Sequence, residues 1–300
     1  MCTSVAITSE NLLFGRNMDI EGSFGEGVVV TPRSFPLRFR LTEPSLSHYA
    51  MIGTAVVVEN EPLYADAMNE RGLCAAGLNF PDLAVYQTVG ETKKTQIAPF
   101  ELIPWVLGNC ATVSEAKQLL EKTTVVSVPF SDALPLTPLH WHFADRHGSI
   151  AVEPMKDGLF VYDDPVGVLA NKPSFPEQLE QLESYGSLTN LSVLGGKGLP
   201  GDYTSQSRFV KTAVMKNWLV IEGEKSAQVD ALFSLLESVA PPKGCVLNSE
   251  GRAHYTTYSC CMDAEEGSYY LKRSGELCVL RFCPTEEMLV GSELSFMNER

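Results

Sequence analysis

The sequence predicts an α+β protein in which strands and helices occupy separate stretches of the chain. Apolar runs typical of strands fill residues 2–80 and 139–170, segments with helical spacing follow each of these, and the last quarter returns to apolar runs. Because strands and helices do not alternate one by one, packed layers are favoured over repeated βαβ units. The pattern by itself leads to the α+β class and no further.

Strands in the first part of the chain are predicted from continuous or alternating apolar residues. They cover Val5–Thr8, Leu12–Arg16, Val28–Thr31, Leu37–Arg40, Met51–Val58 and Leu73–Leu78. Helical spacing follows over Pro99–Leu107 and Val113–Leu120. Thr112 or Ser114 is suited to cap the second helix, with Glu115 in its first turn.

The second half repeats the change from strands to helices. Strands are predicted at Leu139–Ala144, Ile150–Glu153, Leu159–Tyr162 and Val166–Leu169, with turns at His147-Gly148 and Asp157-Gly158. A helix over Phe175–Tyr185 ends at Gly186, and the loop Gly195–Gly201 lacks the Gly-Lys-Ser/Thr ending of a phosphate loop. Two helices and three strands complete the chain, at Thr204–Val220, Ser226–Val239, Tyr255–Met262, Tyr269–Lys272 and Cys278–Phe282.

Composition indicates a globular chain with a sizeable core. The 300 residues are 44% hydrophobic and 20% charged, with no repeat, low-complexity tract or linker, so we expect one domain over residues 1–300. The net charge of −14 argues against a nucleic-acid partner, whose phosphates would be repelled. No apolar run reaches the length of a membrane span, and no signal peptide is evident, so a cytoplasmic location is expected.

No metal or cofactor is expected from the cysteines and histidines. The eight cysteines include no Cys-x-x-Cys pair, so a zinc site of the usual spacing is not predicted, and disulfides are not expected without an export signal. His140 and His142 could lie on one face of a strand as two ligands. A structural role is favoured for this pair, which flanks Trp141.

The strongest chemical signal is the start of the chain, Met1-Cys2. Cys is small enough to allow removal of the initiator methionine, which would leave Cys2 with both a thiol and a free α-amine. A thiolate is a strong nucleophile, and an α-amine can take its proton near neutral pH. A cysteine at the second position often has no catalytic role. Cys2 alone therefore does not identify an active site, and the residues around it must support that interpretation.

Two charged residues are predicted to fold back beside Cys2. The runs Val5–Ile7 and Leu12–Arg16 flank a turn-like Ser9-Glu10-Asn11, which is typical of a β-hairpin. In such a hairpin Arg16 would favour the thiolate by its opposite charge, and Asp19 could accept a hydrogen bond from the α-amine. An ordinary surface Arg–Asp pair is the alternative.

Motifs that occur in order along nearly the whole chain indicate a family resemblance. Met-Cys-Thr at the start and Phe14-Gly-Arg-Asn-Met-Asp19 resemble the choloylglycine hydrolases, the bile salt hydrolases and penicillin V acylases among the N-terminal nucleophile hydrolases. Further matching segments are Val30–Arg33, Pro62–Glu70, Gly77–Pro81, Val168–Pro173 and Gly198–Phe209. The resemblance implies a four-layer αββα sandwich and hydrolysis of an amide by Cys2 after Met1 is removed.

The same resemblance implies the rest of the catalytic group. Asn79 and Asn171 would be oxyanion-hole partners, and Arg208 would lie beside Arg16 near the nucleophile. Each alone has an ordinary explanation, since Asn is common in turns and Arg is common on solvated helices. With Cys2, Arg16 and Asp19 they form a set of six expected catalytic residues.

The expected substrate is a small molecule, a glycine- or taurine-conjugated bile salt. Asn79 followed by Phe80-Pro81 resembles the bile salt hydrolases, whereas penicillin V acylases more often carry Tyr at that position. Expected pocket walls are Met18, Ile20, Phe24, Phe130 and Leu136, because a steroid needs a broad apolar surface. Alternatives are a penicillin V or N-acyl-homoserine lactone acylase and, if Met1 is retained, a noncatalytic binding protein on the same fold.

One departure from the family concerns assembly. The segment between Asn171 and Arg208 is shorter than in the best-known Gram-positive bile salt hydrolases, where an excursion in this region helps to assemble a tetramer. We therefore expect a homo-oligomer that is smaller than that tetramer or packed differently.

Overall fold

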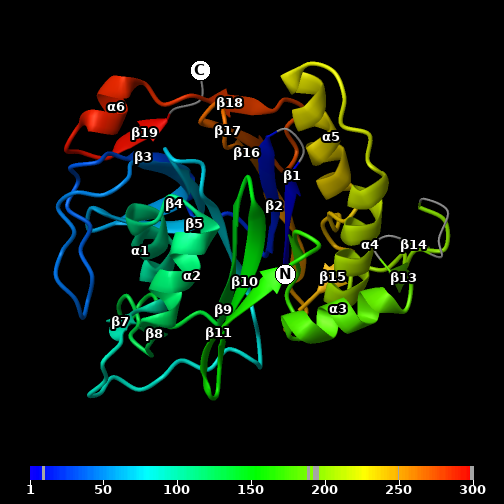
Figure 1. Ribbon diagram of the computed structural model, residues 1–300. Coiled ribbons are helices and arrows are strands. Elements are labelled where there is room, and N and C mark those ends of the chain that lie inside the picture. Colours follow the sequence, from blue (N-terminus) through cyan, green and yellow to red (C-terminus); the bar gives the residue numbers. More distant parts are fainter. Residues whose placement is uncertain (9–10, 188–189, 192–195, 249, 298–300) are drawn as a thin grey trace.

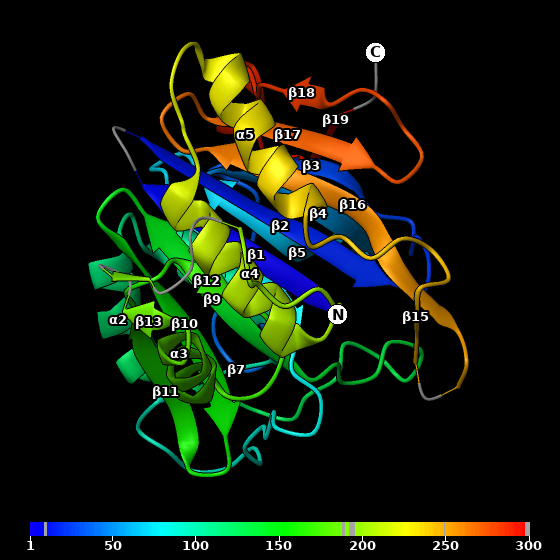
Figure 2. The same ribbon diagram turned by 90° about the vertical axis from the view of Figure 1, so that its right-hand side faces the viewer.

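Two antiparallel sheets lie face to face between two layers of helices (Figure 1). The structure is a computed structural model that describes residues 1–8, 11–187, 190–191, 196–248 and 250–297. The helices α1 (Leu102–Asn109) and α2 (Val113–Glu121) cover one sheet, and α4 (Ser205–Trp218) and α5 (Lys225–Glu237) cover the other (Figures 1 and 2). This is the four-layer αββα arrangement that the sequence resemblance implied.

The first sheet holds the N-terminus. Its seven strands are β12 (Val168–Leu169), β1 (Cys2–Thr8), β2 (Leu12–Ile20), β16 (Ala253–Asp263), β17 (Ser268–Arg273) and β18 (Leu280–Phe282) in spatial order, with β15 (Val246–Leu247) paired to β16. The predicted hairpin is confirmed as β1 and β2, which pair with Cys2 opposite Met18 and Ser4 opposite Arg16.

The second sheet has eight strands. Their order is β11 (Gly158–Asp164), β10 (Gly148–Met155), β9 (Leu139–Asp145), β6 (Cys74–Asn79), β5 (Glu61–Asn69), β4 (Met51–Val58), β3 (Gly27–Thr31) and β19 (Ser295–Met297). Smaller elements are β7 (Thr95–Ile97) with β8 (Thr123–Val125), β13 (Gly186–Ser187) with β14 (Asn190–Leu191), the 3-10 turn Pro99–Glu101, α3 (Phe175–Glu183) and α6 (Glu286–Val290).

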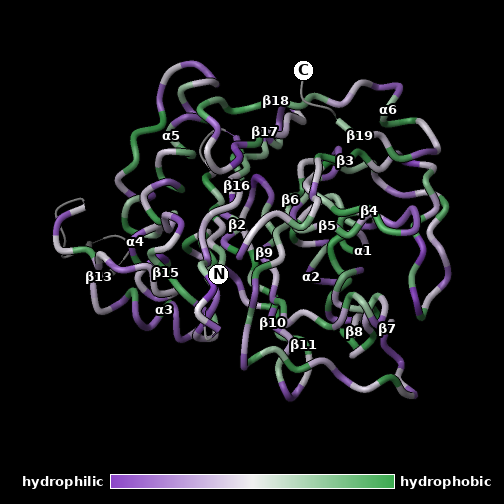
Figure 3. Tube along the Cα trace, turned by 180° about the vertical axis from the view of Figure 1, so that it is seen from behind, coloured by the Kyte–Doolittle hydropathy of each residue, from purple (hydrophilic) through white to green (hydrophobic). Residues whose placement is uncertain are grey.

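The hydrophobic core forms two clusters. One fills the space between the two sheets and under α4 and α5, and the other packs α1 and α2 against the eight-stranded sheet. Hydrophobic residues gather along β4 and α1, whereas the peripheral loops are more hydrophilic (Figure 3). No helix in the described ranges is both long and apolar enough to cross a membrane.

Side-chain alternation along β2 decides which layer each residue reaches. Arg16 faces the second sheet and donates to the carbonyl of Ala65, while Asn17 faces the helices and donates to the carbonyl of Leu236 in α5. Gly15 lets α5 approach this strand closely, because a Cβ there would lie 2.5 Å from Leu232 Cδ2 and 2.8 Å from the Cys260 carbonyl oxygen. The hairpin is thus held between the two layers.

Several sequence predictions of local structure were wrong. Leu37–Arg40 is not a strand, since it makes only one isolated bridge, Leu37 to Ser45, although its alternating apolar residues are buried against the α1 layer. Strand β5 was missed because polar residues and Pro62 interrupt its apolar pattern. The short elements α6 and β19 were also missed, and Gly195 of the predicted loop lies outside the described residues.

Candidate active site

Cys2 is a buried thiol at the edge of an apolar cavity. Its side chain is 3% exposed, and it lines a cavity of about 520 Å³ together with residues from both sheets and from the loop 129–137. The sulfur lies 3.9 Å from Met18 Sδ, its cross-strand neighbour. A molecule in this cavity can therefore present an atom to the thiol.

Arg16 contacts the thiol directly. Its Nη2 donates to Cys2 Sγ at 2.9 Å, and its Nη1 donates to the carbonyl of Ala65 at 3.1 Å. The guanidinium is fully buried, which by itself would lower its pKa, but Cys2, Tyr258 and Asp66 together raise the pKa of Arg16 above its ordinary value. The cation therefore lies where an opposite charge would favour a thiolate, and this is the position that the sequence analysis expected for Arg16.

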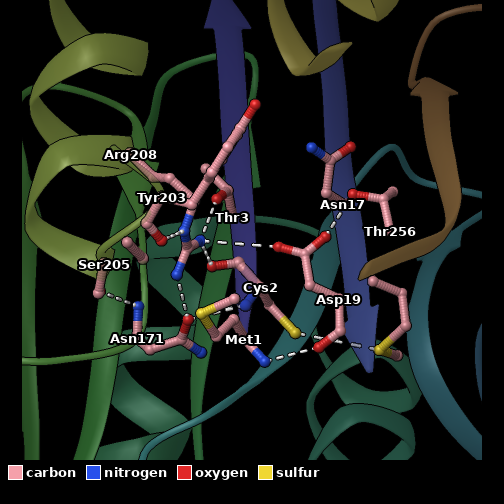
Figure 4. Close-up of polar contacts among 12 residues, drawn as sticks. Met1, Cys2, Thr3, Asn17, Asp19, Asn171, Tyr203, Ser205, Arg208 and Thr256 are labelled. Atoms are coloured by element: carbon pink, nitrogen blue, oxygen red, sulfur yellow. Dashed lines mark hydrogen bonds and ion pairs between the residues drawn. The ribbon is translucent and has the colours of Figure 1, made fainter. Parts of the chain in front are cut away.

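Asn171 connects the backbone of Cys2 to Asn79, another expected site residue, and to Ser205 (the contacts with Cys2 and Ser205 are drawn in Figure 4). Its Oδ1 accepts from the Cys2 backbone nitrogen at 2.7 Å, and its Nδ2 donates to the Asn79 carbonyl at 2.6 Å. Its own backbone nitrogen donates to Ser205 Oγ at 2.8 Å, at the start of α4. Asn79 itself lines the cavity, and Asn171 contacts two residues of that lining, Cys2 and Asn79.

Arg208 lies on the helix side of Cys2 (Figure 4). It extends from the first turn of α4, where Thr204 caps the helix, and donates to the Cys2 carbonyl and to Asn171 Oδ1. Burial lowers its pKa, an effect that Asp19 and Cys2 oppose. Arg208 thus lies near Cys2 as expected, but it contacts the backbone of Cys2, whereas Arg16 contacts the sulfur.

Asp19 lies beside the start of the chain. Its backbone carbonyl accepts the Met1 amine at 2.6 Å, and its Oδ1 accepts from Thr256 Oγ1 at 2.6 Å. With Met1 in place the Cys2 nitrogen is a backbone amide, so the predicted bond between the Asp19 carboxylate and the Cys2 amine stays a prediction. Its Oδ2 lies 3.9 Å from Arg208 Nη1 in a fully buried ion pair. Burial raises the pKa of Asp19 against the opposing effect of Arg208. The side chain therefore balances Arg208 and orients the loop end of β2.

All five residues expected as pocket walls line the cavity. Met18 is buried beside the thiol, whereas Phe24 and Leu136 are 44% and 39% exposed and form the outer rim. Phe130 packs edge-on against Phe100 at 5.3 Å between ring centroids. Sequence reasoning missed wall residues from β5 and α1, because nothing in their local pattern distinguishes a cavity wall from the core.

His140 and His142 each pair with a buried carboxylate. His140 Nδ1 lies 3.2 Å from Glu153 Oε1, and His142 Nε2 lies 3.2 Å from Asp164 Oδ2. Burial lowers the pKa of His140. The two rings therefore serve the packing between the sheets, in agreement with the structural role favoured from the sequence.

Known proteins resemble this chain over almost its whole length. The model of the linear amide C–N hydrolases, choloylglycine hydrolase family, matches residues 2–280. The chain belongs to the choloylglycine hydrolase family. It is therefore an amide hydrolase, and its sandwich is that of the N-terminal nucleophile hydrolases.

Several similar proteins are named as hydrolases of bile salts or conjugated bile acids. The chain is 45% identical over 289 residues to a bile salt hydrolase/transferase of Lactiplantibacillus plantarum, covering 91% of this chain and 89% of that protein. A bile salt hydrolase/transferase of Clostridium perfringens is 35% identical, with 98% and 95% covered. A crystal structure of a conjugated bile acid hydrolase mutant from the same species superposes with a TM-score of 0.90 at 33% identity, covering 100% of this chain and 97% of that one.

The fold extends to an acylase of the family. Penicillin V acylase from Agrobacterium tumefaciens matches with a TM-score of 0.80 at 23% identity, covering 99% of this chain and 90% of that one. At this identity the likeness concerns the fold alone.

Proposed function

We propose that this protein hydrolyses the amide bond of glycine- or taurine-conjugated bile salts, with Cys2 as an N-terminal nucleophile after removal of Met1. The observation that carries the proposal is the contact of Arg16 Nη2 with Cys2 Sγ at the edge of an apolar cavity. The 45% identity to a bile salt hydrolase/transferase supports the choice of substrate. The proposal treats residues 2–300 as one catalytic domain.

The proposed reaction proceeds through a thioester. The Cys2 thiolate attacks the amide carbonyl and forms a C–S bond, and collapse of the tetrahedral intermediate breaks the C–N bond. The α-amine of Cys2 carries the thiol proton to the departing glycine or taurine nitrogen. Water then attacks the thioester, which releases the bile acid and returns the proton to the sulfur.

The two asparagines are proposed to stabilise the oxyanion. One N–H of Asn171 Nδ2 donates to the Asn79 carbonyl, which leaves the second N–H of this amide for the oxygen of the substrate. A donor of this kind contributes about 3–4 kcal/mol to the transition state. Arg208 would hold the Cys2 carbonyl and the Asn171 side chain in place during the reaction, and the buried Asp19 carboxylate would balance its charge.

The cavity suits a steroid better than a charged ligand. Its walls include Met18, Ile20, Phe130 and Leu136, and apolar side chains dominate them. Since the protein carries a net charge of −14, the overall field does not attract an anionic bile salt. Binding would therefore rest on burial of the steroid and on local cations.

The test compares substrates with one batch of enzyme. Release of glycine from glycocholate and of taurine from taurocholate is measured beside cleavage of penicillin V, after intact mass confirms the loss of Met1. Faster turnover of the bile salts supports the proposal. Faster cleavage of penicillin V or of an N-acyl-homoserine lactone would keep the mechanism and replace the substrate, and turnover of none of them would favour a binding protein.

The nucleophile is tested with two substitutions. Cys2→Ser should lose most activity because a hydroxyl is a much weaker nucleophile at neutral pH, and Cys2→Ala should lose all of it. Activity equal to that of the parent in a fully processed Cys2→Ala protein would refute the mechanism.

The proposal includes a homo-oligomer and a cytoplasmic location, where methionine removal takes place. The short segment between Asn171 and Arg208 leads us to expect an assembly smaller than a tetramer or packed differently from the family's tetramer. Sedimentation equilibrium and cell fractionation test these two points, and a tetramer mass would count against the first.

A further inference from the structure

Behind Arg16, on the side away from the thiol, lies a fully buried carboxylate, Asp66 of β5. Its Oδ2 accepts from Tyr258 OH at 2.7 Å and its Oδ1 accepts from Tyr269 OH at 2.5 Å. The Cys260 thiol lies 3.5 Å from Oδ1. A buried carboxylate is costly unless it is paired and hydrogen-bonded, so this group is held by several partners from the opposite sheet.

The carboxylate is joined to the nucleophile through one side chain. Asp66 Oδ2 lies 3.4 Å from Arg16 Nη1, and the other terminal nitrogen of the same guanidinium donates to Cys2 Sγ at 2.9 Å. Because a guanidinium is planar and rigid, fixing Nη1 also fixes the direction of Nη2. Asp66 and the Ala65 carbonyl, which accepts from the same Nη1 at 3.1 Å, are therefore the two acceptors on this side of the cation, and only Asp66 carries a charge.

The network is anchored on both sheets. Tyr269 OH also pairs with Thr54 Oγ1 of β4 at 2.6 Å, and Arg16 lies over the ring of Tyr258. The sequence signal was present in Tyr64-Ala65-Asp66, a segment that matches the family motif but received no role from sequence reasoning. The contact between Asp66 and Arg16 joins the two sheets directly below the thiol.

We propose that Asp66 is a positioning residue for the nucleophile: fixed by Tyr258 and Tyr269, its carboxylate holds the Arg16 guanidinium in the orientation that donates to Cys2 Sγ. This inference rests on the proposed function, because it concerns the same thiol. Asp66 touches neither the thiol nor the cavity, so it acts through Arg16 alone.

The charged and titratable groups around the thiol set the expected sign of a pH experiment. Arg16 faces the sulfur from β2, and Arg208 and Asp19 face the Cys2 backbone from α4 and β2. The amine of the chain terminus lies on the open side with His254, and Asp66, Tyr258, Tyr269 and Cys260 lie behind Arg16. If Asp66 fixes the direction of Arg16, its replacement frees the guanidinium from Cys2 Sγ, and the thiolate form should need a higher pH; if only its negative charge reached the thiol, the thiolate would persist to lower pH.

The first test is Asp66→Asn, which keeps the shape and removes the charge. We expect kcat for glycocholate to fall about 100-fold, because the guanidinium loses its fixed direction. We also expect the pH midpoint of Cys2 alkylation by iodoacetamide, followed by peptide mapping, to rise, because the thiolate loses its oriented donor. Since the alkylation needs no turnover, it tests Asp66 even if the parent cleaves no bile salt and the proposed function fails.

The matched control is Asp263→Asn in β16 of the seven-stranded sheet. Asp263 is also fully buried, but it pairs with Lys225 at 3.0 Å and has no contact with Arg16. Thermal unfolding of both variants shows how much stability each loses. The control should keep the alkylation midpoint of the parent even if it melts earlier, whereas a merely structural role for Asp66 would make both variants behave alike.

A second variant, Tyr269→Phe, should give a smaller change of the same sign. It removes one donor from the carboxylate without touching Arg16, so the carboxylate is held less firmly and the alkylation midpoint should rise by less than in Asp66→Asn. A midpoint that falls or does not move in Asp66→Asn, or a kcat within about threefold of the parent in that variant, would overturn the inference.

Discussion

Replacing Asn171 by Ala tests the centre of the site most directly. The side chain accepts from the Cys2 nitrogen and from Arg208 Nη2, each at 2.7 Å, and donates to the Asn79 carbonyl at 2.6 Å. Alanine removes these three bonds at a position that is 3% exposed, so water cannot easily replace them.

The magnitude follows from the groups left without partners. A buried polar group that loses its hydrogen bond costs about 1–3 kcal/mol, and more if it is charged, as Arg208 is. We expect the free energy of unfolding to fall by about 2–5 kcal/mol. If the amide also donates to the oxyanion, kcat should fall a further 10²- to 10³-fold, which corresponds to about 3–4 kcal/mol.

The assay separates these two effects with Asn69→Ala as the control. Asn69 is equally buried at 3%, and it donates to the carbonyls of Leu107 and Cys110 at 2.7 Å, far along β5 from the thiol. Urea unfolding gives the stability of both variants, and glycocholate hydrolysis, measured well below their melting temperatures, gives kcat and KM. The control should lose similar stability and keep kcat within about threefold.

Two outcomes would refute the reasoning. If Asn171→Ala kept kcat within about threefold, its amide would not serve the transition state. If both variants lost kcat in proportion to their lost stability, the effect would be one of folding and not of catalysis.

Other predictions concern the wall, the hairpin and the pH dependence. Phe130→Ala should raise KM for glycocholate about tenfold with little change in kcat, because it removes apolar surface that binds the steroid; an unchanged KM would place the steroid elsewhere. Gly15→Ala should lower the free energy of unfolding by about 1–3 kcal/mol, since its Cβ would lie 2.8 Å from the Cys260 carbonyl oxygen, and urea titration measures this loss. Burial holds the pKa of His140 below its ordinary value, so the unfolded chain binds a proton that the native state does not. Stability from this group is complete above about pH 6.5 and is lost as the pH falls below it, so a plot of unfolding free energy between pH 5 and 8 should be flatter in His140→Gln.

The sequence led correctly to most of the fold. Apolar runs are enough for β4 and β16, and the cap at Thr112 predicted the start of α2, where its side chain accepts from the Glu115 nitrogen at 3.2 Å. The same reasoning failed at β5, whose polar residues Asp66 and Asn69 are buried because they have partners on other elements. At Leu37–Arg40 the error was the opposite one, a strand that was predicted but is absent. Alternating apolar residues can be buried without a partner strand.

The sequence by itself determined the hairpin, the family and the candidate nucleophile, Cys2. Cys2, Arg16 and Asp19 are close in sequence, and a single β-hairpin is enough to bring Cys2 and Arg16 together. The motifs also named Asn79, Asn171 and Arg208, but only by resemblance.

Only the tertiary structure decided what each of these groups touches. Arg208 reaches the Cys2 carbonyl from a helix 206 residues away, and Asp66 reaches Arg16 from the facing sheet. Alternation along a strand tells which face a side chain takes, but the partner on that face depends on how the layers pack. Since these contacts join buried charges across layers, no local pattern in the chain could have revealed them.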